Sequence, residues 1–164
     1  MSFDSRAFRQ TVGQFVTGVT VIAADIDGTI RAMTANSFTS LSLDPPLVLF
    51  CVGKNTKMGQ LIAGASGFCV NILQQDQQHL STYFAGGWKE EAPPPFTFEA
   101  WEGGPLLAGS AAALGCGVET IYEGGDHWIV IGRVHTLYRS DPAGSPLVFS
   151  GGRYAALAAP VEVP

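Results

Sequence analysis

The residues best suited to chemistry in this sequence form three short polar segments. The first runs from Thr34 to Ser40 and is followed closely by Ser42, so that hydroxyl groups and the Asn36 amide gather beside a predicted strand. Together they offer several hydrogen bonds to a flat polar heterocycle or to a phosphate. The same composition is typical of a polar loop whose side chains bond to nearby backbone, and the pattern alone favours that simpler interpretation.

The second segment is Gly53-Lys54-Asn55-Thr56, which lies between a predicted strand and a predicted helix. Backbone N–H groups without partners collect at a helix start, and they favour a phosphate there. Lys54 adds a positive charge and Thr56 adds a hydroxyl group. The alternative interpretation is an ordinary helix cap beside a solvated lysine.

The third segment is Gly124-Gly125-Asp126-His127, which places a histidine at a turn and next to a carboxylate. A histidine at the mouth of a cleft can donate or accept a hydrogen bond or relay a proton. A surface turn with an incidental histidine would show the same pattern. His79 and His135 fall within a predicted helix and a predicted strand, and both look structural.

Several familiar catalytic signatures are missing from the sequence. Gly115-Cys116-Gly117 lacks the third glycine of a dinucleotide fingerprint, and neither a phosphate loop nor a nucleophile elbow is present. The three histidines are dispersed along the chain, so no metal site is predicted. These gaps disfavour the usual hydrolase, metalloenzyme and Rossmann classes.

The elements that must position these segments belong to one predicted domain, residues 1–164. Only 14% of the residues are charged and 46% are hydrophobic, which excludes a disordered chain. The net charge of −5 supplies no basic surface for nucleic acid. A small domain has a large surface, and this low charged fraction leaves much of that surface uncharged. We therefore expect part of the surface to be buried in a subunit interface.

The cysteine usage and the chain start predict a cytoplasmic location. Cys51, Cys69 and Cys116 are too few and too widely spaced for a disulfide framework or a zinc site, so they are interpreted as reduced core residues. No signal peptide is recognised at the N-terminus. The longest apolar run, 47–52, is far too short to cross a bilayer, and no membrane partner is expected.

Hydrophobic periodicity predicts six or seven strands with a few short helices between them. A first helix is expected to extend through Val16 and to end at Gly18, and Asp76 is expected to cap a later helix. Asp27-Gly28 predicts a tight hairpin. The predicted strands lie at 19–24, 29–33, 47–52, 67–73, 111–121, 128–137 and 145–149. Because helices do not alternate regularly with strands, we expect an antiparallel barrel with helical insertions.

The order of several motifs resembles the flavin reductase-like family, the small reductase components of two-component flavin-dependent monooxygenases. The resemblance runs from about residue 8 to about residue 157. Its strongest parts are the segment from Thr34 to Pro46 and the Gly-Asp-His unit that ends at His127. Further matches are FVTGVTV at 15–21, FCVNIL at 68–73, QQHLSTYFA at 77–85, GRV at 132–134 and Pro146-Leu147 ahead of Tyr154.

This resemblance implies an FMN-binding split β-barrel, mainly β, that forms a homodimer. It also implies an oxidoreductase that uses NADH or NADPH to reduce FMN or FAD. The reduced flavin would diffuse to a separate oxygenase component. The nicotinamide and flavin rings must stack closely for hydride transfer, so that the protein acts mainly by positioning them.

The resemblance also assigns expected roles to residues. Flavin binding is expected from Thr34, Ala35, Asn36, Ser37, Ser40, Ser42, Cys51, Val52, Gly53, Lys54, Thr56 and Phe84. His127 is expected to be the catalytic residue that meets the nicotinamide, with Tyr154 beside it, and Phe15, Thr17 and Gly18 are expected to border that pocket. No metal is expected.

The chain departs from the family pattern around Cys116. Gly115 and Gly117 stand where charged residues are common, and a looser strand is expected there. The loop 86–95 is variable in the family, so the resemblance does not decide whether it acts as a lid over the site. Rival interpretations are a carrier of the same fold with tightly bound FMN and a non-catalytic flavin- or haem-binding module.

Overall fold

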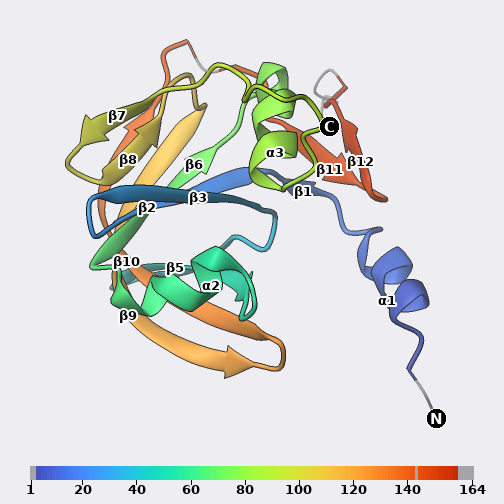
Figure 1. Ribbon diagram of the computed structural model, residues 1–164, viewed down its shortest axis with the longest axis horizontal. Coiled ribbons are helices and arrows are strands. Elements are labelled where there is room, and N and C mark those ends of the chain that lie inside the picture. Colours follow the sequence, from blue (N-terminus) through green and yellow to red (C-terminus); the bar gives the residue numbers. More distant parts are fainter. Residues whose placement is uncertain (1–2, 143, 159–164) are drawn as a thin grey trace, which may run out of the picture.

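The computed structural model describes residues 3–142 and 144–158, and its centre is a curved, seven-stranded antiparallel sheet (Figure 1). The strand order is β3-β2-β6-β9-β10-β5-β4. In chain order these strands are β2 (Thr20–Ile26), β3 (Thr29–Ala35), β4 (Thr39–Leu43), β5 (Pro46–Gly53), β6 (Gly67–Ile72), β9 (Ala112–Gly124) and β10 (His127–Arg139). The expectation of a mainly β fold with few helices is confirmed.

Two small sheets flank the large one. One has the order β1-β11-β12, and the other pairs β7 with β8. Their bounds are β1 (Thr17–Gly18), β11 (Val148–Ser150), β12 (Arg153–Ala155), β7 (Phe98–Trp101) and β8 (Gly104–Leu107). Strands β1, β4, β7, β8 and β12 were not predicted, because strands of two to five residues are too short to establish a period.

The helices are short, with five to eight residues each. They are α1 (Ser5–Val12), α2 (Lys57–Leu61) with the 3₁₀ turn Ile62–Gly64, and α3 (Gln78–Phe84) after the 3₁₀ turn Gln75–Gln77. No helix in the described part of the chain is long and apolar enough to span a membrane.

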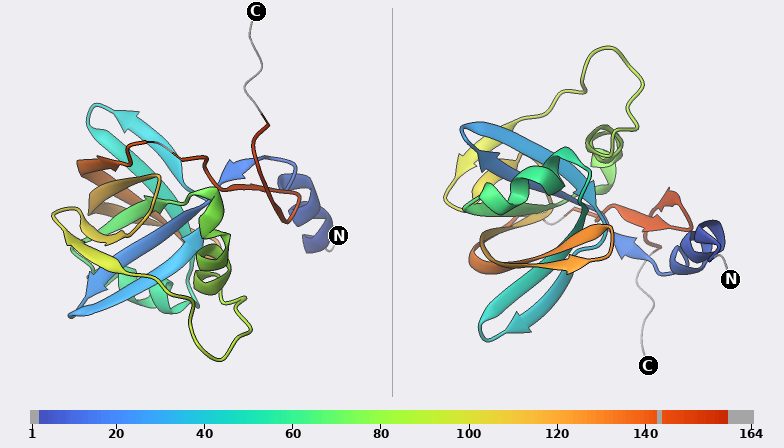
Figure 2. Two further views of the ribbon diagram at one scale, coloured as in Figure 1. Left: turned by 90° about the horizontal axis from the view of Figure 1, so that it is seen from above. Right: turned by 60° about the horizontal axis from the view of Figure 1, so that its bottom comes forward.

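Two expectations about helix ends were wrong. Helix α1 ends at Val12 rather than continuing through Val16, and Gly18 lies in β1. Because α1 buries none of its residues, no packing extends its apolar stripe, and Figure 2 shows it standing apart from the sheet. Asp76 does not cap α3. Instead, Gln74 and Gln77 form a capping box at the 3₁₀ turn before it.

The predicted hairpin between β2 and β3 is confirmed. Asp27 has a φ of 53° and Gly28 a φ of 75°, the two positive values that a type I′ turn requires. The turn fixes the register of the pair, so Thr20 lies opposite Ala35 at the far end. The hairpin therefore delivers the polar segment that begins at Thr34 to a defined place at the end of β3.

The core lies inside the curve of the sheet. Ile22, Phe50, Phe68, Val70 and Val130 are among its fully buried side chains. The rings of Phe50 and Phe68 meet edge to face, with centroids 5.0 Å apart. Alternate residues of β5 point inward, so that strand carries an apolar inner face while its last residues reach the surface at Gly53.

Candidate functional site

The end of β3 is tied to two different elements by side-chain hydroxyl groups. Thr34 Oγ1 donates a hydrogen bond of 2.7 Å to the carbonyl oxygen of Ser81 in α3. Ser37 Oγ donates to the carbonyl oxygen of Cys51 over 3.1 Å and accepts from the Cys51 N–H over 3.0 Å. The segment from Thr34 to Ser37 is therefore held between α3 and β5, while the Asn36 side chain stays exposed.

A hollow of about 660 Å³ opens beside this segment. Its walls come from α1, β1, β11 and the stretch from residue 36 to residue 39, and they include Phe8, Phe15, Thr17, Asn36, Ser37 and Phe149. Thr17 Oγ1 is buried and has no hydrogen-bond partner. The resemblance placed Phe15, Thr17 and Gly18 at the border of the nicotinamide pocket. In the structure Phe15 and Thr17 line this hollow, whereas Gly18 and His127 do not.

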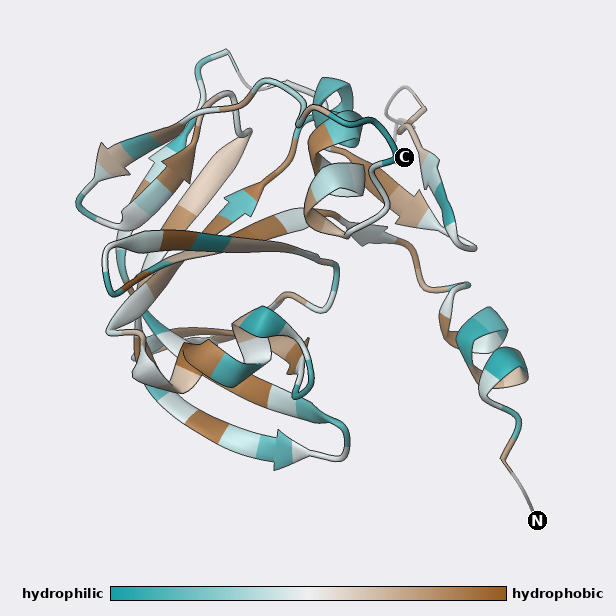
Figure 3. Cartoon of the chain, in the orientation of Figure 1, coloured by the Kyte–Doolittle hydropathy of each residue, from teal (hydrophilic) through white to brown (hydrophobic). Residues whose placement is uncertain are grey.

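The second and third polar segments meet at one end of the sheet. Gly53 at the end of β5 pairs with His127 at the start of β10, and the Lys54 N–H donates to the Asp126 carbonyl oxygen over 3.0 Å. His127 Nδ1 lies 2.8 Å from Asp126 Oδ1. The hydrogen bond from His127 lowers the pKa of the Asp126 carboxyl below its ordinary value. Figure 3 shows the resulting hydrophilic tip of the β9–β10 hairpin.

Lys54 is held by two groups of that hairpin. Its Nζ lies 3.4 Å from Glu123 Oε1 and 4.5 Å from the centroid of the Trp128 ring. Both contacts place the ammonium group over the β9–β10 hairpin, on the face that carries Glu123 and Trp128. The sequence analysis did not single out Trp128, because a tryptophan in a predicted strand is indistinguishable from a core residue.

Thr56 caps helix α2, which is the simpler of the two interpretations of the Gly53–Thr56 segment. Its hydroxyl accepts from the Gly59 N–H over 3.0 Å and donates to the Gly53 carbonyl oxygen over 2.8 Å. The hydroxyl therefore caps α2 and fixes the turn after β5, and its single proton is already used.

The other residues that were expected to contact flavin differ in how far their side chains are exposed. Ala35 and Val52 are buried in the core, so only their backbone groups can meet a ligand. Cys51 is half-buried, with its backbone bonded to Ser37. Ser40 and Ser42 lie in edge strand β4, the first exposed and the second half-buried.

Tyr154 lies on the opposite flank of the Thr34–Ser37 segment from His127. Its hydroxyl is 2.9 Å from Ser81 Oγ and 3.4 Å from Thr82 Oγ1, both in α3. Figure 1 places β12 beside α3 and the start of β10 at the other end of the sheet. Within one chain, the structure does not bring together this tyrosine and the histidine that the resemblance placed beside it.

Phe84 lies at the end of α3, within a cluster of aromatic side chains. Its ring centroid is 5.0 Å from that of Phe96 and 5.9 Å from that of Phe98. Phe84 also lines a second hollow, of about 630 Å³, between α2, α3 and β3. The loop 86–95 leads from α3 into this cluster, where Trp88 Nε1 donates to the Ala92 carbonyl oxygen.

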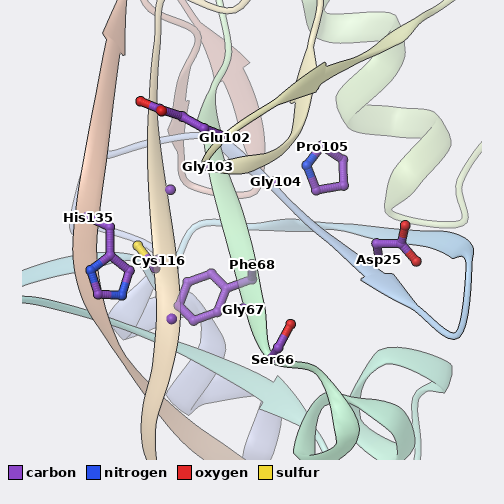
Figure 4. Close-up of a pocket in the computed structure, with 12 residues that line it drawn as sticks. Asp25, Ser66, Gly67, Phe68, Glu102, Gly103, Gly104, Pro105, Cys116 and His135 are labelled. Carbon is purple, nitrogen blue, oxygen red and sulfur yellow. The ribbon is translucent and has the colours of Figure 1, made fainter.

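A third hollow lies against β6 and β9, and its lining includes Gly67, Gly115, Cys116, Gly117 and His135 (Figure 4). The pairing of β9 with β10 is irregular at this point, with a register shift between Val134 and Thr136. A Cβ at Gly115 would collide with the backbone of Gly103 and one at Gly117 with His135. The two glycines therefore permit close packing of neighbouring chain segments. Burial raises the pKa of the Cys116 thiol to about 12.

Comparison with known proteins agrees with this fold. The chain matches the flavin reductase like domain family over residues 12–158, and it belongs to that family. It is 42% identical to the NADH-dependent FAD reductase of Streptomyces globisporus over 92% of this chain and 85% of that protein. It is 38% identical to HsaB, the reductase subunit of a flavin-dependent monooxygenase from Rhodococcus jostii, over 99% of this chain and 83% of HsaB.

A solved structure of similar fold carries ligands. The NADH:FAD oxidoreductase SgcE6 of Streptomyces globisporus, in complex with NAD and FAD fragments, matches with a TM-score of 0.86 and 39% identity. The match covers 97% of this chain and 96% of that chain.

Proposed function

We propose that this protein is an NAD(P)H-dependent flavin reductase that reduces FMN or FAD and supplies the reduced flavin to a separate monooxygenase component. The observation that carries the proposal is the hollow of about 660 Å³ beside Asn36 and Ser37, which the aromatic side chains of Phe8, Phe15 and Phe149 also line. The names of its relatives, an FAD reductase and a monooxygenase reductase subunit, support the same activity.

Different residues of this site would bind the two substrates, the flavin and the nicotinamide nucleotide. Asn36 and the backbone from Thr34 to Ser37 would hold the flavin ring, and Lys54 would attract its phosphate. The flavin accepts a hydride from the nicotinamide, which leaves oxidised NAD(P)⁺ and a flavin carrying two more electrons. His127 would bind the nicotinamide nucleotide, because its ring is about half exposed and its orientation is fixed by Asp126.

We propose a split barrel and a homodimer for the quaternary arrangement. Ser37 bonds the end of β3 to β5 across the opening between the sheet's edges, which supports closure. On the outer face, the partly exposed Leu49 and Ile131 pair directly. Strand β4 and the N-terminal segment around α1 also expose apolar side chains, and a second copy of the chain would bury them. These side chains are Leu41, Leu43, Phe8, Val12, Phe15 and Val16. The three cysteines are free thiols, which supports the expected cytoplasmic location.

Loss of the absorbance of the reduced nicotinamide tests the activity directly. NADH and NADPH are each assayed with FMN, FAD and riboflavin, and we expect turnover with at least one pair. No oxidation with any flavin would refute the proposal. A yellow protein that keeps its flavin through purification would favour an electron carrier, and flavin or haem binding without turnover would favour a non-catalytic module.

A further inference from the structure

The Tyr154 hydroxyl group makes contacts that the expected role beside the nicotinamide does not explain. It lies 2.9 Å from Ser81 Oγ and 3.4 Å from Thr82 Oγ1, both in α3. The Ser81 side chain is buried, and among the residues that the structure describes Tyr154 is the one hydrogen-bond partner of its hydroxyl group. A buried hydroxyl without a partner is costly, so the Tyr154 hydroxyl stabilises α3 at this point.

Ser81 also holds the first residue of the segment that is proposed to bind the flavin. Its carbonyl oxygen accepts a hydrogen bond of 2.7 Å from Thr34 Oγ1 and one of 3.0 Å from the Ala85 N–H. Ser81 is therefore bonded to β12 through its side chain and to the end of β3 through its backbone. A shift of α3 at Ser81 would move the anchor of Thr34 as well.

On its other side, Tyr154 packs against a residue that lines the hollow beside Asn36. Tyr154 pairs with Phe149 across β11 and β12, and Phe149 pairs with Thr17 across β1 and β11. Side chains of directly paired residues lie on the same face of a sheet. The Phe149 and Tyr154 rings meet edge to face with centroids 5.5 Å apart, and Phe149 and Thr17 both line the hollow.

The contacts of Tyr154 thus connect two walls of the same hollow. One wall is formed by β1 and β11, where Phe149 lies. The other begins at Asn36 and Ser37, which follow Thr34 by two and three residues. The Tyr154 hydroxyl is a polar link between these walls, because it ties the small sheet to the helix that holds Thr34 (Figure 1).

We infer that Tyr154 is a positioning residue for the flavin: its hydroxyl holds Ser81, and Ser81 holds the segment 34–37 in the shape that binds the flavin. This inference rests on the proposed function and gives Tyr154 a part in flavin binding instead of nicotinamide binding. Because the hydroxyl acts through α3, its loss weakens the binding of FMN and FAD alike and leaves use of the nicotinamide nucleotide unchanged.

The test removes the bond between Tyr154 and Ser81 from either side, in Tyr154→Phe and in Ser81→Ala. The first variant keeps the ring that packs against Phe149, and the second removes a single oxygen from α3. We expect KM for the flavin to rise about fivefold in each, the loss of one neutral hydrogen bond, with kcat and KM for NADH within about twofold of wild type. The double variant should show the same rise as each single variant, because all three lack the same bond.

Tyr138→Phe is the matched control, since it also removes one tyrosine hydroxyl. Tyr138 is half-buried in β10, packs against the cluster of Cys69, Leu106 and Ala113, and does not line the hollow. KM for the flavin should keep its wild-type value in this variant.

Three outcomes would overturn the inference. A rise in KM for NADH, alone or together with an equal rise for the flavin, would show that the hydroxyl is not specific to the flavin. Additive losses in the double variant would show that the two hydroxyl groups act separately. A wild-type KM for the flavin in both single variants would show that their bond does not position the segment.

Direct binding separates this inference from the proposed activity. Calorimetric titration with FMN and with FAD, in the absence of nicotinamide nucleotide, should give a Kd that is about fivefold higher in Tyr154→Phe. If the Kd rises but neither NADH nor NADPH is oxidised, the positioning role stands and the reductase proposal fails. If either is oxidised but both flavins bind the variant as tightly as wild type, the reductase proposal stands and the positioning role fails.

Discussion

The Asp126 carboxylate accepts a hydrogen bond of 2.8 Å from Nδ1 of His127. This bond places the ring proton on Nδ1, so the neutral ring offers Nε2 to a ligand as an acceptor. The two residues lie at the tip of the β9–β10 hairpin, where His127 pairs with Gly53. The arrangement links the histidine to the end of β5 that also carries Lys54.

Replacing the histidine should impair use of the nicotinamide substrate. In His127→Ala we expect kcat/KM for NADH to fall about 10–100-fold, the loss of one to two hydrogen bonds. Steady-state oxidation of NADH at saturating flavin measures the effect. His79→Ala is the control, since His79 is an exposed helix residue whose Nδ1 lies 3.1 Å from the Asp76 carbonyl oxygen. An unchanged kcat/KM for NADH would remove His127 from the site.

Asp126 should act through the histidine rather than on the substrate. Asp126→Asn keeps the shape but weakens the bond to Nδ1, so we expect a loss of about two- to fivefold in kcat/KM for NADH, because exposed contacts of this kind are weak. The double variant with His127→Ala should show no further loss. Additive losses in the double variant would mean that Asp126 acts independently.

Lys54 should matter for flavins that carry a phosphate. Lys54→Ala is expected to raise KM for FMN about fivefold to tenfold and to have little effect on riboflavin, which has no phosphate. Added salt should raise the wild-type KM for FMN more than that of the variant. Lys89→Ala, in the exposed loop 86–95, is the matched control. An equal rise in KM for riboflavin would contradict the assignment.

The Ser37 hydroxyl should contribute measurably to stability. Ser37→Ala leaves the N–H and carbonyl groups of Cys51 without that partner, so we expect the free energy of unfolding to fall by about 1–3 kcal/mol. Urea unfolding with an unchanged m-value measures this loss. Ser40→Ala, at an exposed strand position, should change the free energy by less than about 0.5 kcal/mol. Equal effects of the two substitutions would show that the bonds to Cys51 contribute nothing.

The buried thiols should resist alkylation in the folded protein. Burial raises the pKa values of Cys69 and Cys116 from 9.0 to about 12, and for Cys69 the nearby Cys116 adds to the rise. Because the thiolate is the reactive form, we expect both to react with iodoacetamide at about pH 8 at least ~100-fold more slowly than in urea. Peptide mass spectrometry follows each site, and fast modification of Cys69 before unfolding would contradict the prediction.

The same pKa values fix the direction of a pH effect on stability. Folding favours the protonated thiols, so their contribution to stability is complete below about pH 9. It is lost as the pH rises from there toward the folded-state values near 12.

Local sequence determined much of the secondary structure. Runs of β-branched and apolar residues predicted the long strands, Asp27-Gly28 predicted the turn that begins β3, and Thr56 was a candidate cap for α2. These features depend on neighbours a few residues apart, so periodicity and turn chemistry are sufficient to find them. The short strands and the cap of α3 escaped prediction because their signals span too few residues.

Only the tertiary structure decided how the polar segments meet. Strand β5 pairs with β10, about 80 residues further along the chain, and this pairing sets Lys54 beside His127. Bonds from Thr34 to α3 and from Ser37 to β5 hold their segment between the two, while Tyr154 docks on α3. Which strands become neighbours depends on burying one shared core, a property of the whole chain that no local window of sequence contains.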